Sequence, residues 1–119
     1  MIVRYSRPEM ASLWTEQSKF ERWLEVELAH CRAACDMGAI PKTDLAEITS
    51  RAMIDVARIS EIENTTNHDV IAFLESLAEK IGPSARHIHR GLTSTDIVDT
   101  ALVLTMKRAI QLVEKGLQE

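Results

Sequence analysis

Apolar residues recur at intervals of three and four along most of this 119-residue chain, and that spacing is typical of α-helices with one buried face. The first strong stripe follows Ser18 and Glu21, a pair that matches a capping box. Gly38 and Pro41 come after it and favour a helix end. The pattern therefore predicts a helix from Ser18 to about Gly38. Its apolar residues are Phe20, Trp23, Leu24, Leu28, Cys31, Ala34 and Cys35.

Two shorter helices are predicted next. Thr43 or Asp44 is a suitable N-cap for one that continues to about Met53. Asp55 is a suitable N-cap for another. The apolar residues of that helix share one face, and they are Val56, Ile59 and Ile62. No convincing strand pair or internal repeat is present, so the predicted fold class is all-α.

The polar residues 64–67 separate these helices from a further one. His68 and Asp69 stand in its first turn, and Gly82 with Pro83 ends it. Its apolar stripe is Val70, Ile71, Leu74, Leu77, Ala78 and Ile81. Residues 84–92 show no clear period, so a loop or a short extended segment is expected there.

The last helix is predicted to begin among residues 93–96, which are four capping residues in a row. It continues to the end of the chain and is longer than most helices of globular proteins. An apolar stripe of that length needs partners to cover it. We therefore expect this helix to pack in an oligomer, and the chain to be truncated inside a longer helical domain.

Composition limits the classes of partner. The chain has 14 Lys and Arg against 18 Asp and Glu, a formal net charge of -4. That balance argues against a nucleic-acid partner, but a small anionic ligand needs only a few local cations. No apolar run approaches the roughly 20 residues of a membrane span, and the first residues have no signal-peptide pattern. Cys31 and Cys35 are expected to be small buried thiols rather than metal ligands. We expect a cytoplasmic protein without a membrane segment.

Three polar clusters could carry chemistry. Arg4 and Tyr5 could bind a phosphate or carboxylate, although a solvated terminal arm is the simpler interpretation. The second cluster, residues 66–69, stands at a helix start, where unpaired amides favour an anion and His68 could move a proton near neutral pH. Plain capping by Thr66 or Asn67 would explain the same residues.

The third cluster, residues 87–96, ends in hydroxyls at a second helix start, which suits a substrate carboxylate. A metal site formed by His87, His89 and His68 is conceivable, but no ligand spacing supports it, and we expect no metal. Neither a glycine-rich phosphate loop nor a Ser-His-Asp pattern is recognisable. The residues alone indicate a helical domain with two helix starts suited to anions, and they do not name a reaction.

Four segments resemble motifs of one enzyme family. They are RYSRPEM at 4–10, WLEVE at 23–27, TNHDV at 66–70 and HRGLTSTDIVDT at 89–100. Together and in this order they are similar to the bacterial adenylosuccinate lyase family, which belongs to the fumarase and aspartase superfamily. The resemblance implies a three-domain, all-helical homotetramer with a central helix bundle and shared active sites. Residues 1–93 would be the first domain, and residues 94–119 would begin the bundle.

The resemblance also implies a reaction. Such lyases eliminate fumarate from adenylosuccinate to give AMP, and from the succinyl-carboxamide ribotide earlier in purine synthesis. A base removes a proton beside a carboxylate, and an acid protonates the departing nitrogen. The small-molecule nucleotide substrate is the expected partner, and no metal or organic cofactor is implied.

Roles follow for single residues. Arg4 would bind the substrate phosphate, and Thr93 with Ser94 would bind the succinyl carboxylate. His68 and His89 are the candidates for a catalytic role. The other substrate-binding candidates are Tyr5, Asn67, Asp69 and His68 itself. The family's proton-donating histidine and its catalytic serine come later than these motifs, so the chain alone is expected to be inactive. Other lyases of the superfamily, such as argininosuccinate lyase, and a non-catalytic helical interaction module are the alternatives.

Overall fold

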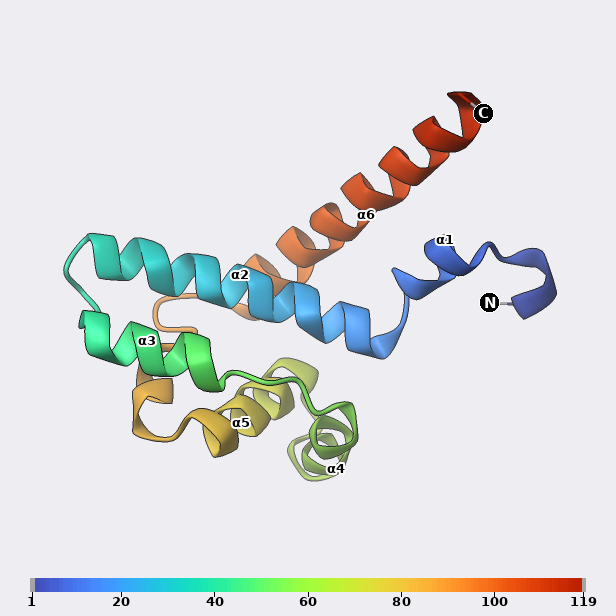
Figure 1. Cartoon of the computed structure of the whole chain (residues 1–119). Helices are drawn as coiled ribbons and strands as arrows, with labels where there is room; N and C mark the ends of the chain where they lie inside the picture. Colours follow the sequence, from blue (N-terminus) through green and yellow to red (C-terminus); the bar gives the residue numbers. More distant parts are fainter. Residues whose placement is uncertain (1, 119) are drawn as a thin grey trace.

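The computed structural model of the chain describes residues 2–118, and every regular element in that range is a helix (Figure 1). The predicted all-α class is therefore confirmed. The elements are the short 3-10 helices η1 (Val3–Tyr5) and η2 (Pro83–His87) and the α-helices α1 (Pro8–Ser12), α2 (Glu16–Asp36), α3 (Lys42–Arg51), α4 (Val56–Thr66), α5 (Asp69–Ile81) and α6 (Ser94–Gln118).

Helix α2 begins earlier than predicted. Its N-cap is Thr15, whose side chain accepts a hydrogen bond from the backbone N–H of Ser18 at 3.1 Å. The Ser18 hydroxyl instead donates to the Ser12 carbonyl at 2.6 Å. The assignment of Ser18 as the cap was wrong because two hydroxyl residues stand three apart, and periodicity alone does not choose between them.

Helix α3 also differs from the prediction at both ends. It begins at Lys42 after Pro41, which provides no side-chain cap, and it ends at Arg51 rather than near Met53. Asp44 does not cap the helix because its carboxylate accepts hydrogen bonds from residues of η2, far along the chain. A tertiary partner has taken the side chain that a local rule assigned to capping.

The predicted junctions around α5 are confirmed in part. Asp55 caps α4 by accepting from the Arg58 amide at 3.0 Å. The polar residues 64–66 belong to α4, so the predicted separating stretch shrinks to Asn67. Helix α5 begins after His68 and ends before Gly82, as predicted. Residues 84–92, expected to be a loop or extended segment, begin instead with the 3-10 helix η2.

The core joins α2 to α5. Phe73 of α5 is fully buried. The centroid of its ring lies 6.0 Å from that of Phe20 and 5.5 Å from that of Trp23, both on α2. Phe20 and Trp23 contact each other edge-on at 5.2 Å. Offset and edge-on arrangements at these distances are the favourable geometries for aromatic pairs. This cluster fixes the layer of α3, α4 and α5 below α2 (Figure 1).

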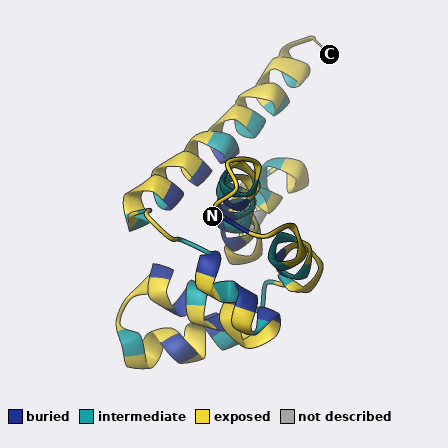
Figure 2. Cartoon of the chain, turned by 90° about the vertical axis from the view of Figure 1, so that its left-hand side faces the viewer, coloured by how far each residue is buried: buried dark blue, intermediate teal, exposed yellow. Residues whose placement is uncertain are grey.

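Helix α6 packs against α2 only through its first half. Ile97, Ala101 and Thr105 are buried, and Arg108 of α6 pairs with Glu25 of α2 at 3.3 Å. Beyond that point the helix projects from the body and is mostly exposed (Figure 2). Five of its exposed apolar residues follow one another at spacings of three and four, the repeat of a helix-bundle seam. They are Val103, Met106, Ile110, Val113 and Leu117. Within residues 2–118, no helix combines the length and apolarity that a membrane crossing requires.

Candidate functional site

The first predicted cluster, Arg4 and Tyr5, lies in η1 at the right-hand end of the molecule in Figure 1. The Arg4 guanidinium lies over the Tyr5 ring, 4.9 Å from its centroid. Tyr5 is 76% exposed, so both groups stand in solvent next to each other. A guanidinium beside a phenol hydroxyl can bind a phosphate or a carboxylate, and nothing else in residues 2–118 occupies them.

The second cluster forms the α4–α5 junction. Asn67 has a left-handed backbone (φ 49°), a conformation that asparagine tolerates better than most residues. It turns the chain so that His68 caps α5, with Nδ1 accepting from the Ile71 amide at 3.3 Å. Asp69 accepts from the Val70 amide at 2.7 Å. The junction is therefore a capped helix start with His68 and Asp69 both exposed.

The hydrogen bond of His68 determines where its proton lies. A ring nitrogen that accepts a hydrogen bond carries no proton, so a neutral His68 must carry it on Nε2. The Nδ1 atom also lies 3.7 Å from the Asp69 carboxylate. His68 therefore offers a hydrogen-bond donor at Nε2.

The third cluster is the start of α6. Both Thr93 donors are used by Asp96, which accepts from the Thr93 amide at 2.7 Å and from its hydroxyl at 3.1 Å. These two bonds, followed by a contribution from the nearby His89, hold the pKa of Asp96 below its ordinary value of 3.8. The hydroxyl of Ser94, the first residue of α6, has no hydrogen-bond partner within residues 2–118. It is available to a ligand at a helix N-terminus, where amides and the helix dipole favour an anion.

His89 belongs to the same site. Its backbone is left-handed (φ 63°), and its carbonyl accepts from the Leu92 amide at 3.2 Å just before α6. Its ring Nδ1 lies 2.6 Å from a carboxylate oxygen of Glu27 on α2. Because a carboxylate only accepts, a neutral His89 carries its proton on Nδ1 and leaves Nε2 as an acceptor. His68 and His89 thus offer opposite hydrogen-bonding groups to a ligand: Nε2 of His68 is a donor, and Nε2 of His89 is an acceptor.

Sequence reasoning missed Glu27. In the sequence, Glu27 is a charged residue inside an apolar stripe, four residues after Trp23 and four before Cys31. In the structure all three residues are buried. A buried carboxylate requires a partner, but the partner is 62 residues away along the chain. Periodicity could therefore flag Glu27 but could not identify His89.

The structure separates the three histidines that a metal site would have needed. His87 contacts Asp44 through Nε2 at 2.8 Å, whereas His89 faces Glu27 and His68 caps α5. Within residues 2–118, no group of three or more His, Cys, Asp or Glu side chains is arranged to hold a metal ion.

Burial, followed by the nearby Glu27, raises the pKa of the Cys31 thiol to about 11, so that thiol stays protonated and unreactive at neutral pH.

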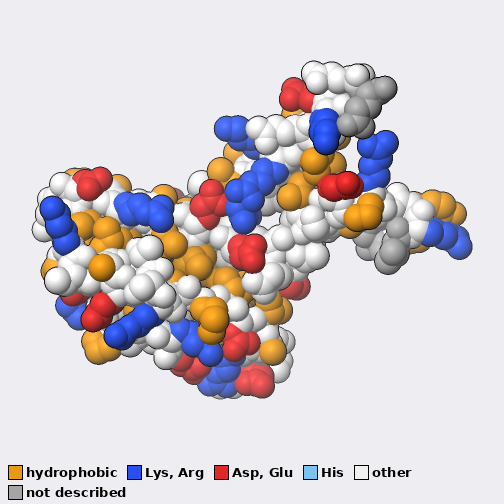
Figure 3. Space-filling view, viewed as in Figure 1, with side chains coloured by type: hydrophobic (Ala, Val, Ile, Leu, Met, Phe, Trp, Pro, Cys, Tyr) orange, Lys and Arg blue, Asp and Glu red, His pale blue; other side chains and the backbone are white. Residues whose placement is uncertain are grey.

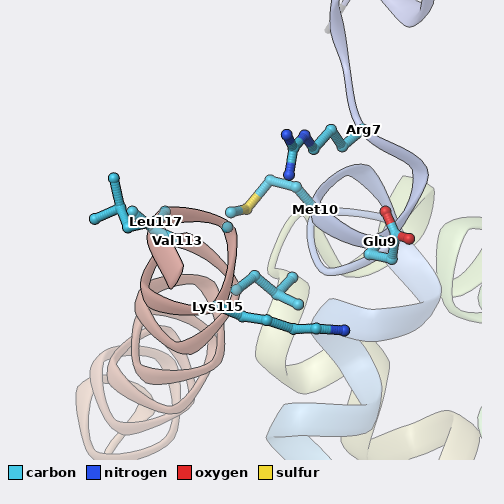
Figure 4. A pocket seen from close by; sticks show the side chains of 8 residues that line it. Arg7, Glu9, Met10, Val113, Lys115 and Leu117 are labelled. Carbon is cyan, nitrogen blue, oxygen red and sulfur yellow. The ribbon is translucent and has the colours of Figure 1, made fainter. Parts of the chain in front are cut away.

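The Arg4 and Tyr5 cluster lies apart from the other two clusters within one chain. No hydrogen bond or ion pair joins one cluster to another in residues 2–118, and η1 lies apart from the α4–α5 junction and the start of α6 in Figure 1. Figure 3 shows α6 and the N-terminal segment projecting from the body, with charges of both signs interspersed over this face. A hollow of about 350 Å³ lies between α1 and the end of α6. Arg7, Met10 and Lys115 line it (Figure 4), and none of the predicted site residues does.

Comparison with known proteins identifies the family. The sequence model described as "Lyase" matches residues 3–119. The chain belongs to this lyase family. It is 48% identical over 118 residues to the adenylosuccinate lyase of Staphylococcus saprophyticus, covering 99% of this chain and 27% of that enzyme. The expected resemblance to adenylosuccinate lyases is thereby confirmed.

Solved structures of this lyase family share the fold. A fumarate lyase from Mesorhizobium sp. BNC1 superposes with a TM-score of 0.82 at 28% identity, covering 93% of this chain and 28% of that one. The 3-carboxy-cis,cis-muconate lactonizing enzyme of Pseudomonas putida superposes with a TM-score of 0.83 at 26% identity, covering 95% and 27%. The chain therefore spans about a quarter of the length of these relatives.

Proposed function

We propose that this chain supplies part of the active site of an adenylosuccinate lyase, which eliminates fumarate from adenylosuccinate and from the succinyl-carboxamide ribotide of purine synthesis. The observation that carries the proposal is the 48% identity to an adenylosuccinate lyase over nearly the whole chain. The four motifs that resemble that family contain the three polar clusters described above. Argininosuccinate cleavage and a purely structural role are the competing functions.

The chemistry assigns a distinct role to each cluster. Removing a proton beside a carboxylate places a second negative charge on it, so donors fixed in advance stabilise the intermediate. The Ser94 hydroxyl and the N-terminal amides of α6 are such donors. His68 can donate a proton or a hydrogen bond through Nε2, and His89 can accept one through its own Nε2. Arg4, exposed and next to Tyr5, can bind the remote phosphate. No metal or organic cofactor is required for these steps.

Assembly of the site requires more than one chain. Because the Arg4 and Tyr5 cluster lies apart from the other two within one copy, we infer that a homotetramer brings clusters from different copies together. The exposed seam of α6, defined above by its five apolar residues, supports this inference, since a repeat of three and four is the pattern of helices that pack in a bundle. We propose that this enzyme acts in the cytoplasm and binds neither nucleic acid nor membrane.

A hybrid enzyme tests the proposal. Residues 2–118 replace the matching segment of the Staphylococcus saprophyticus enzyme, and the remainder of that enzyme is kept. The hybrid should release fumarate and AMP from adenylosuccinate, which absorbance and chromatography measure. The remainder expressed without any replacement segment is the control and should be inactive. A folded, tetrameric hybrid without fumarate release would contradict the proposed function.

A further inference from the structure

Glu27 is a charged side chain in the apolar core, and it is fully buried. Its two oxygens contact the same residue: Oε1 lies 2.6 Å from the ring Nδ1 of His89, and Oε2 accepts from the backbone N–H of His89 at 3.0 Å. Burying a carboxylate is unfavourable unless it is well paired. One carboxylate therefore fixes both the ring and the backbone of a single histidine.

The backbone of His89 is unusual in the same place. Its φ of 63° is in the left-handed region, which is uncommon for residues other than glycine, although asparagine, aspartate and histidine are found there more often than the rest. The bond from its backbone N–H to Glu27 is one of the contacts that enforce this conformation. The conformation and the ring orientation of His89 thus depend on one side chain of α2.

A second buried pair in the chain provides a contrast. His87 contacts Asp44 through Nε2, its Nδ1 is buried without a partner, and its side chain is only 9% exposed. His89 is 18% exposed, and its Nε2 is neither paired within residues 2–118 nor among the buried unpaired atoms. The Asp44 pair encloses its histidine, whereas the Glu27 pair leaves one nitrogen of His89 open to a ligand.

We propose that Glu27 is a positioning residue that acts through His89. It holds the ring proton on Nδ1 and leaves the unprotonated Nε2 without a partner in residues 2–118, in the segment just before α6. The kinetic consequence rests on the proposed function, because His89 must contact the substrate for its orientation to affect turnover. The tautomer of His89 does not depend on that function and can be measured separately.

The first experiment measures the tautomer in this chain, labelled with ¹⁵N-histidine and studied by NMR at a pH where the ring is neutral. In the wild-type chain the His89 proton should be on Nδ1. Glu27→Met keeps an unbranched side chain of similar length but removes both acceptors, so the proton should move to Nε2. The Asp44→Asn variant is the matched control and should leave His89 unchanged. A wild-type proton on Nε2, or no change in a folded Glu27→Met chain, would overturn the proposal.

The second experiment measures the kinetics of Glu27→Gln in the hybrid enzyme. Glutamine retains the shape of glutamate and one acceptor oxygen, so this variant can be used even if Glu27→Met does not fold. Turnover should fall about 10- to 100-fold, the range for misplacing a catalytic group, with a smaller change in KM. In a His89→Ala background, adding Glu27→Gln should cause no further loss. Additive losses would show that Glu27 does not act through His89 and would overturn the proposal.

The two experiments keep the two claims distinguishable. If the wild-type hybrid is inactive, the proposed function fails, and the tautomer of His89 still decides the role of Glu27. If the hybrid is active and Glu27→Gln has wild-type kinetics, the proposed function stands and the positioning role is refuted. Asp44→Asn in the hybrid should keep near wild-type turnover, because its partner His87 is enclosed.

Discussion

The aromatic cluster of α2 and α5 predicts a large effect from one substitution. Phe73 has no exposed surface. Its ring centroid lies 6.0 Å from that of Phe20 and 5.5 Å from that of Trp23. Phe73→Ala removes the ring that lies between two segments about 50 residues apart in the chain. Because the surrounding helices relax only partly, the substitution leaves a cavity in addition to the lost burial.

The expected loss of unfolding free energy is about 3 to 5 kcal/mol, the usual cost of a buried Phe→Ala change. The lost ring contacts, each worth roughly 0.5 to 1.5 kcal/mol, place the value toward the upper end. A domain of this size has a total stability of about 5 to 15 kcal/mol. Phe73→Ala should therefore remove roughly a fifth or more of the stability of the chain.

Urea denaturation measures this loss, with helix content by circular dichroism and the fluorescence of Trp23 as two probes. Trp23 is buried, whereas Trp14 is 46% exposed, so the fluorescence change on unfolding reports mainly on this cluster. Ile71→Ala on the same helix is the matched control, because Ile71 is 44% exposed and should cost about 1 kcal/mol or less. Equal losses for the two variants would refute the assignment of the core.

Three further outcomes follow from the site. The pKa of Asp96 is lowered from its ordinary value of 3.8 in the folded chain. Its contribution to stability is therefore present above pH 3.8 and is lost as the pH falls through the lower folded pKa. Asp96→Asn should weaken the dependence of Tm on pH in this acid range. In the hybrid, Ser94→Ala should mainly lower the turnover number and Arg4→Ala should mainly raise KM, because only Ser94 is proposed to hold the developing charge; unchanged kinetics in both would refute these roles. The His68→Gln variant should be nearly inactive alone. It should regain activity in mixed tetramers with a second variant that is altered only in the later proton-donor histidine. Verified mixed tetramers without recovered activity would contradict a shared site.

Local sequence patterns predicted most of the helices because their causes are local. The apolar stripe and the Gly82 stop determined α5, and Asp55 caps α4 as predicted. Errors occurred where two local rules competed or where a distant residue took over a side chain. Thr15 caps α2 in place of Ser18, and Asp44 binds η2 in place of capping α3.

The candidate site was predictable only in its parts. Residues suited to anions were found at two helix starts because capping chemistry and anion binding use the same groups. The contact between Glu27 and His89 joins residues 62 positions apart, and no periodicity encodes it. Sequence also could not show that the Arg4 and Tyr5 cluster lies apart from the other two, since that depends on the path of the chain before α2.

We propose that these clusters form one substrate site to which several copies of the chain contribute. A crystal structure of the hybrid enzyme with AMP and fumarate bound tests it most directly. We expect fumarate on Ser94 at the start of α6 and the AMP phosphate on Arg4, with His68 reaching the same ligands from a different copy. Ligands bound away from Ser94 and Arg4, or a site in which one copy supplies all three residues, would contradict it.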